Sequence, residues 1–96
     1  MQIDEKSKTQ IKSAAQRVLL CDYELLLFGS RAKDRARQFS DIDIAIDSKG
    51  PITLTQLLHI SGELDDSNLP YKVDIVDLSK VTGSFRDNII KEGIKL

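Results

Sequence analysis

The sequence has little cysteine, no excess of charge of either sign and no long hydrophobic run. Cys21 is the single cysteine among 96 residues, which excludes an internal disulfide framework and a multi-cysteine zinc site. The 14 basic and 15 acidic side chains give a net charge of −1, which does not favour direct nucleic-acid binding. No apolar run approaches the roughly 20 residues of a membrane span, and residues 1–6 lack the apolar core of a signal peptide. We therefore expect a cytoplasmic protein that does not bind a membrane.

The length and composition favour one folded domain over residues 1–96. A chain of 96 residues has no room for two hydrophobic cores. Its hydrophobic share of 41% is that of an ordinary globular protein and argues against disorder. A chain of this size buries only roughly 60–68% of the surface that it exposes when unfolded. The margin of stability is then small, and a stabilising partner surface is a reasonable expectation.

The hydrophobic pattern alternates between helical and strand spacing. Helical periodicity predicts two long helices, at residues 4–20 and 53–66. Short apolar or strictly alternating runs predict three strands, at residues 23–28, 41–47 and 71–76. A chain that alternates helices and strands in this way forms a small sheet covered by helices, so the expected fold class is α/β.

Two further helices are expected. Ser30 is a good N-cap directly after Gly29, which predicts a short helix starting there. Helical spacing predicts a last helix from four apolar residues, Leu78, Val81, Phe85 and Ile89. We expect Phe85, Ile89 and Ile90 to lie in the core, the alternative being an exposed docking patch.

Three aspartates in the predicted strands are the most informative feature. Asp41 and Asp43 share one face of a strand, although strand interiors disfavour Asp and the two charges repel each other. Asp74 lies between apolar Val73 and Ile75 in another strand. If the two strands are neighbours, the three carboxylates converge and form a hard oxygen site suited to Mg²⁺ or Mn²⁺.

Other interpretations of these aspartates stay open. An isolated Asp-x-Asp pattern is more often a solvated sheet face or a strand edge. A calcium loop starting at Asp41 is excluded, because its fifth, sixth and twelfth positions lack the oxygen ligand, glycine and glutamate that it needs. Asp77 follows the third strand and competes with Asp74 as the third carboxylate. We prefer Asp74 because its apolar neighbours place it inside the strand.

Gly29 and Ser30 mark a turn that suits a phosphate group. Gly29 lets the backbone approach a ligand, and a helix beginning at Ser30 would direct free N–H groups at an anion. Arg31 could add charge-assisted hydrogen bonds. Taken alone, the segment could also be a plain strand-to-helix turn with a serine cap. Together with the aspartates it supplies what phosphoryl-type transfer needs, phosphate positioning and two-metal charge neutralisation.

The same residues resemble the signature of a known family. Residues 29–32 (Gly-Ser-Arg-Ala) are followed after seven residues by 40–44 (Ser-Asp-Ile-Asp-Ile). This pattern resembles the nucleotidyltransferases of the DNA polymerase β superfamily, and most of all their minimal (MNT) branch. Residues 73–77 are similar to the strand with that family's third carboxylate, and 90–96 to its C-terminal helix. The resemblance covers residues 23–96 and implies a small mixed sheet flanked by helices.

The resemblance also implies an activity. A nucleoside monophosphate, AMP if the substrate is ATP, would pass from a nucleoside triphosphate to a hydroxyl with release of pyrophosphate. The catalytic residues and metal ligands would be Asp41, Asp43 and Asp74. Asp74 would also help to activate the acceptor hydroxyl. The residues holding the β- and γ-phosphates would be Gly29, Ser30 and Arg31. Asp34 stands where the family often has glycine, which bears on the efficiency of nucleotide binding.

A protein partner is implied as well. MNT proteins of this size resemble the antitoxin halves of toxin–antitoxin pairs, in which AMP is transferred to a tyrosine of a helical HEPN toxin. Two alternatives stay open. One is an inactive module that only masks a helical partner; the other is a small-molecule nucleotidyltransferase whose acceptor site comes from another chain or a homodimer interface. The presence of all three aspartates favours the active enzyme, and an expected lack of an acceptor domain favours an acceptor on another chain.

Overall fold

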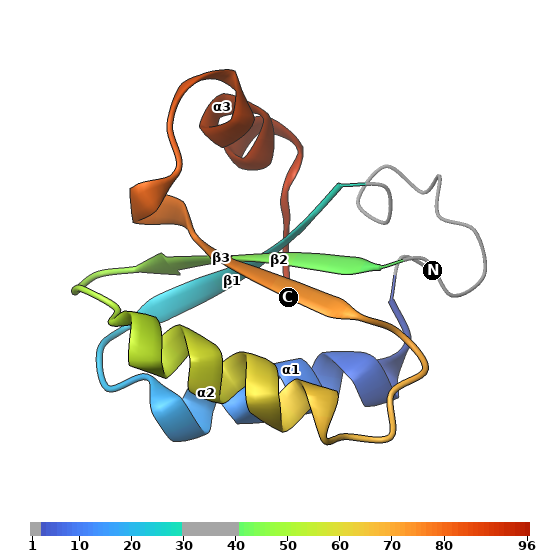
Figure 1. Ribbon diagram of the computed structural model, residues 1–96. Helices are drawn as coiled ribbons and strands as arrows, with labels where there is room; N and C mark the ends of the chain where they lie inside the picture. The colour runs from blue at the N-terminus through green and yellow to red at the C-terminus, as the bar shows by residue number, and fades with distance from the viewer. Residues whose placement is uncertain (1–2, 30–40) are drawn as a thin grey trace.

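The computed structural model describes residues 3–29 and 41–96, which form a mixed sheet with helices on both faces (Figure 1). In chain order the elements are α1 (Glu5–Val18), β1 (Tyr23–Phe28), β2 (Ile42–Ser48), α2 (Leu54–Asp65), β3 (Val73–Asp77), the 3₁₀ turn η1 (Leu78–Lys80), α3 (Gly83–Glu92) and β4 (Ile94–Lys95). The strand order is β3-β2-β1-β4, with β2 and β3 parallel and the other pairs antiparallel. The expected α/β (α+β) class with a small mixed sheet is confirmed.

The main hydrophobic core lies between the sheet and the α1–α2 layer. The alternation of β2 directs Ile42, Ile44 and Ile46 to this side, where all three are fully buried. The two helices complete this core with Ile11, Ala14, Ala15, Ile60 and Leu64. Burial of each isoleucine side chain contributes about 1.5–3 kcal/mol. A slip of one residue would expose this whole set, so the core fixes the register of β2 and with it the direction of Asp43.

The opposite face of the sheet is covered by α3. Ala45 of β2 is fully buried there and packs in a smaller cluster with Leu78 of η1 and Ile89 of α3. Figure 1 shows α3 as the one long helix on this side among the described residues. A single helix covers less of a sheet than two helices do. This face therefore keeps space beside Asp43, which is on the same side of β2 as Ala45.

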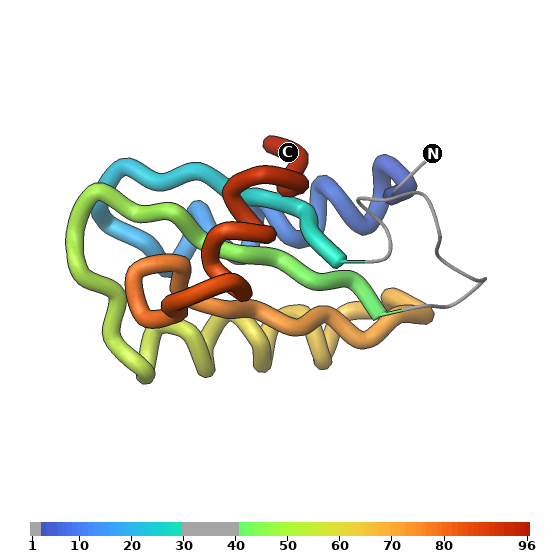
Figure 2. The backbone as a smooth tube through the Cα atoms, turned by 90° about the horizontal axis from the view of Figure 1, so that it is seen from above, coloured from blue at the N-terminus to red at the C-terminus, as the bar shows by residue number. Residues whose placement is uncertain are grey.

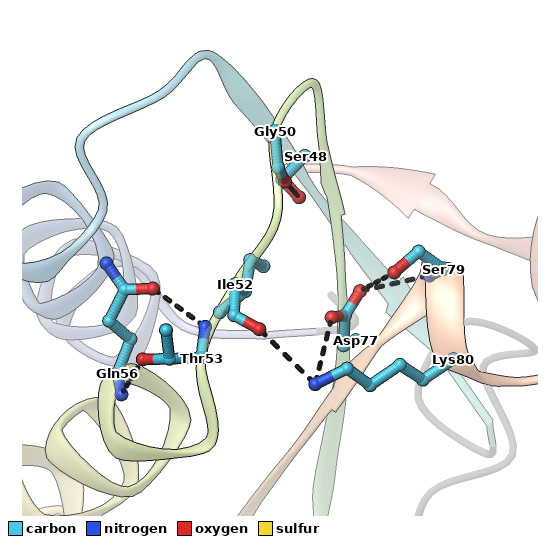
Figure 3. Close-up of polar contacts among 8 residues, drawn as sticks. All are labelled: Ser48, Gly50, Ile52, Thr53, Gln56, Asp77, Ser79 and Lys80. Atoms are coloured by element: carbon cyan, nitrogen blue, oxygen red, sulfur yellow. Dashed lines mark hydrogen bonds and ion pairs between the residues drawn. The ribbon is translucent and has the colours of Figure 1, made fainter.

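α2 begins at a capping box (Figure 3). The hydroxyl of Thr53 accepts a hydrogen bond from the backbone N–H of Gln56 (3.1 Å), and the Gln56 side chain accepts one from the backbone N–H of Thr53 (2.9 Å). The helix predicted over 53–66 therefore starts at Leu54, directly after its cap. Neither α2 nor another helix in the described part of the chain is long and apolar enough to cross a membrane.

The C-terminal segment differs from the prediction in two ways. Leu78 belongs to the separate turn η1, so the last helix covers only Gly83–Glu92. Residues 90–96 do not continue as a helix, because Gly93 ends α3 with its N–H donated to Ile89 O (2.8 Å) and the chain then enters β4. β4 pairs with β1 through two residues, which is too short a strand for an alternating pattern to reveal.

Phe85 and Ile90 were predicted in the core, and that prediction is wrong. Ile89 is buried, but the side chains of Phe85 and Ile90 are 47% and 55% exposed. The reason is the position of α3, which presents one side to the sheet and has no helix beside it within the described residues. Ile90 lies outside the side of α3 that carries Ile89, whereas Phe85 is on that side but borders open space beside the sheet.

Candidate functional site

The candidate site forms where three strand ends meet. β1 ends at Phe28 beside the start of β2, because the two strands are antiparallel, and β3 starts next to β2 because that pair is parallel. Figure 2 shows these three ends at the same edge of the sheet, beside α3. The register places Asp43 opposite Phe28 on one side and opposite Asp74 on the other. Two of the three predicted carboxylates are therefore direct cross-strand neighbours.

A pocket of about 510 Å³ lies between these strand ends and α3. Its lining combines the candidate carboxylates with residues from β1, β3 and α3, namely Phe28, Gly29, Asp43, Asp74, Val76, Phe85, Asn88, Ile89 and Glu92. The volume is within the usual range of small-molecule sites. The four residues from α3 follow the spacing i, i+3, i+4 and i+7, which places them on one side of the helix.

Asp43 has the strongest electrostatic constraint in this pocket. Burial is the largest cause that raises the pKa of the Asp43 carboxyl, and the charges of Asp74 and Asp41 raise it further. Lys72 lies beside Asp74, with 3.8 Å between Nζ and Oδ1, but both side chains are well exposed. A bound cation would stabilise the charged form of Asp43 more effectively than such an exposed lysine.

Gly29 brings the backbone against Asp43. Its φ of +76° is in the left-handed region that favours glycine. A Cβ atom at this position would overlap Oδ2 of Asp43 and lie 3.3 Å from its Cγ. Only a residue without a side chain can therefore form this turn and leave the carboxylate in place.

The donor set suits a hard divalent cation. Asp43 and Asp74 offer carboxylate oxygens from neighbouring strands, and Asp41 is exposed just before β2 but close enough to act on Asp43. Mg²⁺ and Mn²⁺ prefer oxygen ligands of this kind. Within residues 3–29 and 41–96, no three His, Cys, Asp or Glu side chains are already grouped as a metal site. The close approach of the Gly29 backbone to Asp43, and the charges of Asp41 and Asp74 beside it, fit a cation that binds together with a phosphate ligand.

The structure places Asp77 outside the pocket, at the end of β3. Its Oδ1 accepts hydrogen bonds from the backbone N–H (3.0 Å) and hydroxyl (2.8 Å) of Ser79, which caps η1 (Figure 3). Lys80 places Nζ 3.9 Å from Oδ2 of Asp77 and 3.3 Å from the carbonyl oxygen of Ile52. The Asp77 side chain is buried and caps η1, while Lys80 connects η1 to the loop before α2. It is Asp74 that faces the pocket.

Three predicted features lie outside the described residues: Ser30 with its expected helix, Arg31, and Asp34. The sequence reasoning missed the α3 side of the pocket, because Phe85 was expected in the core, with an exposed docking patch as the alternative, and Asn88 and Glu92 were not considered as site residues. The signal that could have found them is the helical spacing of two polar residues with Phe85 and Ile89.

Asp43→Asn is expected to stabilise the metal-free protein slightly at neutral pH, because it removes a partly exposed charge that its surroundings disfavour. A group whose pKa is higher in the folded state stabilises the fold below its unfolded pKa, and that contribution is lost as the pH rises through the folded pKa. At neutral pH the charged Asp43 therefore weakens the fold, since its pKa is raised. The gain should shrink as the pH falls and wild-type Asp43 becomes protonated. Urea unfolding with a chelator present measures it, and an unchanged midpoint at neutral pH would contradict it.

Residues 8–96 match the family model described as "Polymerase beta, Nucleotidyltransferase". This range includes the whole sheet and every residue that lines the pocket. The chain belongs to this family and is a nucleotidyltransferase. The resemblance seen in the motifs around Gly29 and Asp43 is thereby confirmed.

Individual relatives agree with this assignment. A Haemophilus influenzae protein named "Probable protein adenylyltransferase MntA" is 35% identical over 92 residues, covering 94% of this chain and 80% of the relative. A solved toxin–antitoxin structure with AMP-PNP has a TM-score of 0.77 at 23% identity, covering 92% of this chain and 70% of that one. A solved structure described as a tri-AMPylated Shewanella oneidensis HEPN toxin in complex with MNT antitoxin has a TM-score of 0.73 at 22% identity. The match covers 99% of this chain and 71% of that one. At these identities the two structures show a shared fold.

Proposed function

We propose that this protein transfers AMP from ATP to a hydroxyl group of a helical HEPN-type partner protein and so acts as the antitoxin of a toxin–antitoxin pair. The observation that carries the proposal is the cross-strand pair Asp43 and Asp74, held at one end of a pocket against the backbone of Gly29. The 35% identity to the Haemophilus influenzae protein adenylyltransferase supports AMP as the transferred group and a protein as the acceptor. The fold shared with the HEPN–MNT complex supports a HEPN-type partner.

We assign separate roles in phosphate binding and metal binding to the residues of the candidate site. Gly29 places its backbone where the triphosphate approaches the carboxylates, and we assign Ser30 and Arg31 to the same phosphate group. Asp41, Asp43 and Asp74 would hold Mg²⁺ or Mn²⁺, which when bound neutralises phosphate charge and polarises the phosphoryl oxygens. Asp43, with its raised pKa and its place between two other carboxylates, has the largest electrostatic reason to bind a cation.

The transfer step consumes one ATP and one acceptor hydroxyl. The hydroxyl oxygen forms a bond to the α-phosphorus, and the bond from the α-phosphorus to the oxygen that bridges to the β-phosphate breaks. Pyrophosphate leaves with that electron pair. The hydroxyl proton passes to Asp74, whose Oδ2 is the oxygen that is not paired with Lys72. We assign the same pocket as the place where the acceptor side chain of the partner protein would enter.

The test uses the purified chain with a HEPN-type protein, ATP and Mg²⁺, and the product of the neighbouring gene is the first partner to try. We expect label from the α-phosphate of ATP to appear on the partner, label from the γ-phosphate to stay off it, and a chelator to abolish transfer. Intact mass measurement should show the addition of whole AMP units. Transfer of the γ-label, or no labelling of the partner with Mg²⁺ present, would overturn the proposal.

A further inference from the structure

One part of the pocket is apolar and lies apart from the carboxylates Asp43 and Asp74 that we assign to metal and phosphate binding. Phe28 and Phe85 meet there edge to face, with ring centroids 5.8 Å apart and an angle of 73° between the rings. Val76 and Ile89 add further apolar surface. Phe85 is 47% exposed and lines the pocket, so a ligand there can contact it. Aromatic surface of this kind stacks well with a flat heterocycle.

Two polar residues stand on the same side of α3 as Phe85. Asn88 follows Phe85 by three residues, Glu92 follows Asn88 by four, and all three line the pocket. The amide of Asn88 offers donors and an acceptor, whereas the carboxylate of Glu92 offers acceptors only. This wall therefore combines a stacking surface with a mixed hydrogen-bonding edge. The Asp43–Asp74 end, in contrast, suits phosphate and metal.

From this division we infer that the α3 wall is the nucleobase subsite and that Asn88 selects adenine over guanine. The inference rests on the proposed function, because it assumes that a nucleoside triphosphate occupies the pocket. Adenine carries an amino donor next to a ring-nitrogen acceptor, a pair that an amide side chain matches with one acceptor and one donor.

The substitution Asn88→Asp separates recognition of the base from binding of the phosphates. A carboxylate cannot donate to the ring nitrogen of adenine, but it can accept from the ring N–H and amino group of guanine. The ratio of the dissociation constants for ATP and GTP should therefore shift by about ten- to a hundredfold towards GTP, the usual discrimination of one bidentate contact. Asn88→Leu, which removes the amide without adding charge, should bring the ratio close to one.

The measurement is calorimetric titration of the chain alone with ATP and with GTP in Mg²⁺. Asn68→Asp is the matched control, because it adds the same charge at an exposed position that does not line the pocket. It should leave the ratio unchanged. Phe85→Ala should weaken ATP and GTP binding by similar factors, since stacking does not depend on base identity.

The outcomes separate this inference from the proposed function. If wild type prefers ATP and the ratio moves only in the Asn88 variants, the inference is supported. If wild type binds ATP but the Asn88 variants keep its ratio, or if wild type binds both nucleotides equally, the base subsite is wrong while the proposed function stands. If wild type binds neither nucleotide, both are overturned.

Discussion

Asp43→Asn and Asp74→Asn are each expected to lower the rate of AMP transfer by at least about a hundredfold, the scale on which one electrostatic group in an active site acts. Asparagine keeps the size of the side chain and removes its charge. The pocket then loses one of two carboxylates that face each other across β2 and β3, while the core on the other side of the sheet is unchanged. The measurement is the initial rate of α-label transfer from ATP to the partner.

Asp47→Asn is the matched control for these variants. Asp47 is on the same strand as Asp43, is exposed and pairs with Glu24 at the far end of β2 from the pocket. Its loss should leave the transfer rate within about twofold, because surface substitutions away from a site have small effects. Transfer above a tenth of the wild-type rate in both pocket variants would contradict the assigned roles. Because Asp43→Asn is expected to be the more stable protein, unfolding would not explain its loss of activity.

Gly29→Ala is expected to reduce transfer by about a hundredfold or more and to destabilise the fold by about 1–3 kcal/mol. Two effects act together at this position. The backbone has a φ of +76°, and the new methyl group would overlap Oδ2 of Asp43. Either the turn or the carboxylate must move, and a displacement of about 1 Å is enough to disrupt catalytic geometry. Urea unfolding and the transfer assay measure the two consequences separately.

Gly83→Ala distinguishes backbone strain from the contact with Asp43. Gly83 also has a positive φ, +65°, but a Cβ atom there would have no neighbour within 4 Å. This variant should lose about 1–2 kcal/mol of stability from strain and retain activity under folding conditions. If Gly83→Ala lost transfer as fully as Gly29→Ala while remaining folded, the special role of Gly29 at the carboxylate would be contradicted.

Much of the fold could be predicted because it depends on spacing along the chain. The alternation in β2 showed which residues face the core, and the structure buries Ile42, Ile44 and Ile46 completely. The same alternation placed Asp43 on the other face, where it lines the pocket. The choice of Asp74 over Asp77 followed from its apolar neighbours, and in the structure only Asp74 of the two lines the pocket.

The α3 region could not be predicted in the same way. Phe85 and Asn88 have an ordinary helical pattern, and nothing local indicates which side of the helix the sheet covers. That depends on packing against Leu78 and, above all, against Ala45 of β2, which is distant in sequence. The two residues of β4 form a strand only because β1 offers a free edge beside them. Here tertiary pairing decided the local structure.

By itself, the sequence determined the main helices and strands and the face of β2 on which Asp43 lies. Each of these follows from residue type and short-range periodicity. Only the tertiary structure decided that Asp43 stands opposite Asp74, that Gly29 presses its backbone against Asp43, and that α3 closes one side of the pocket. These features depend on strand order and on the packing of one face of the sheet, which arise from contacts between segments far apart in the chain.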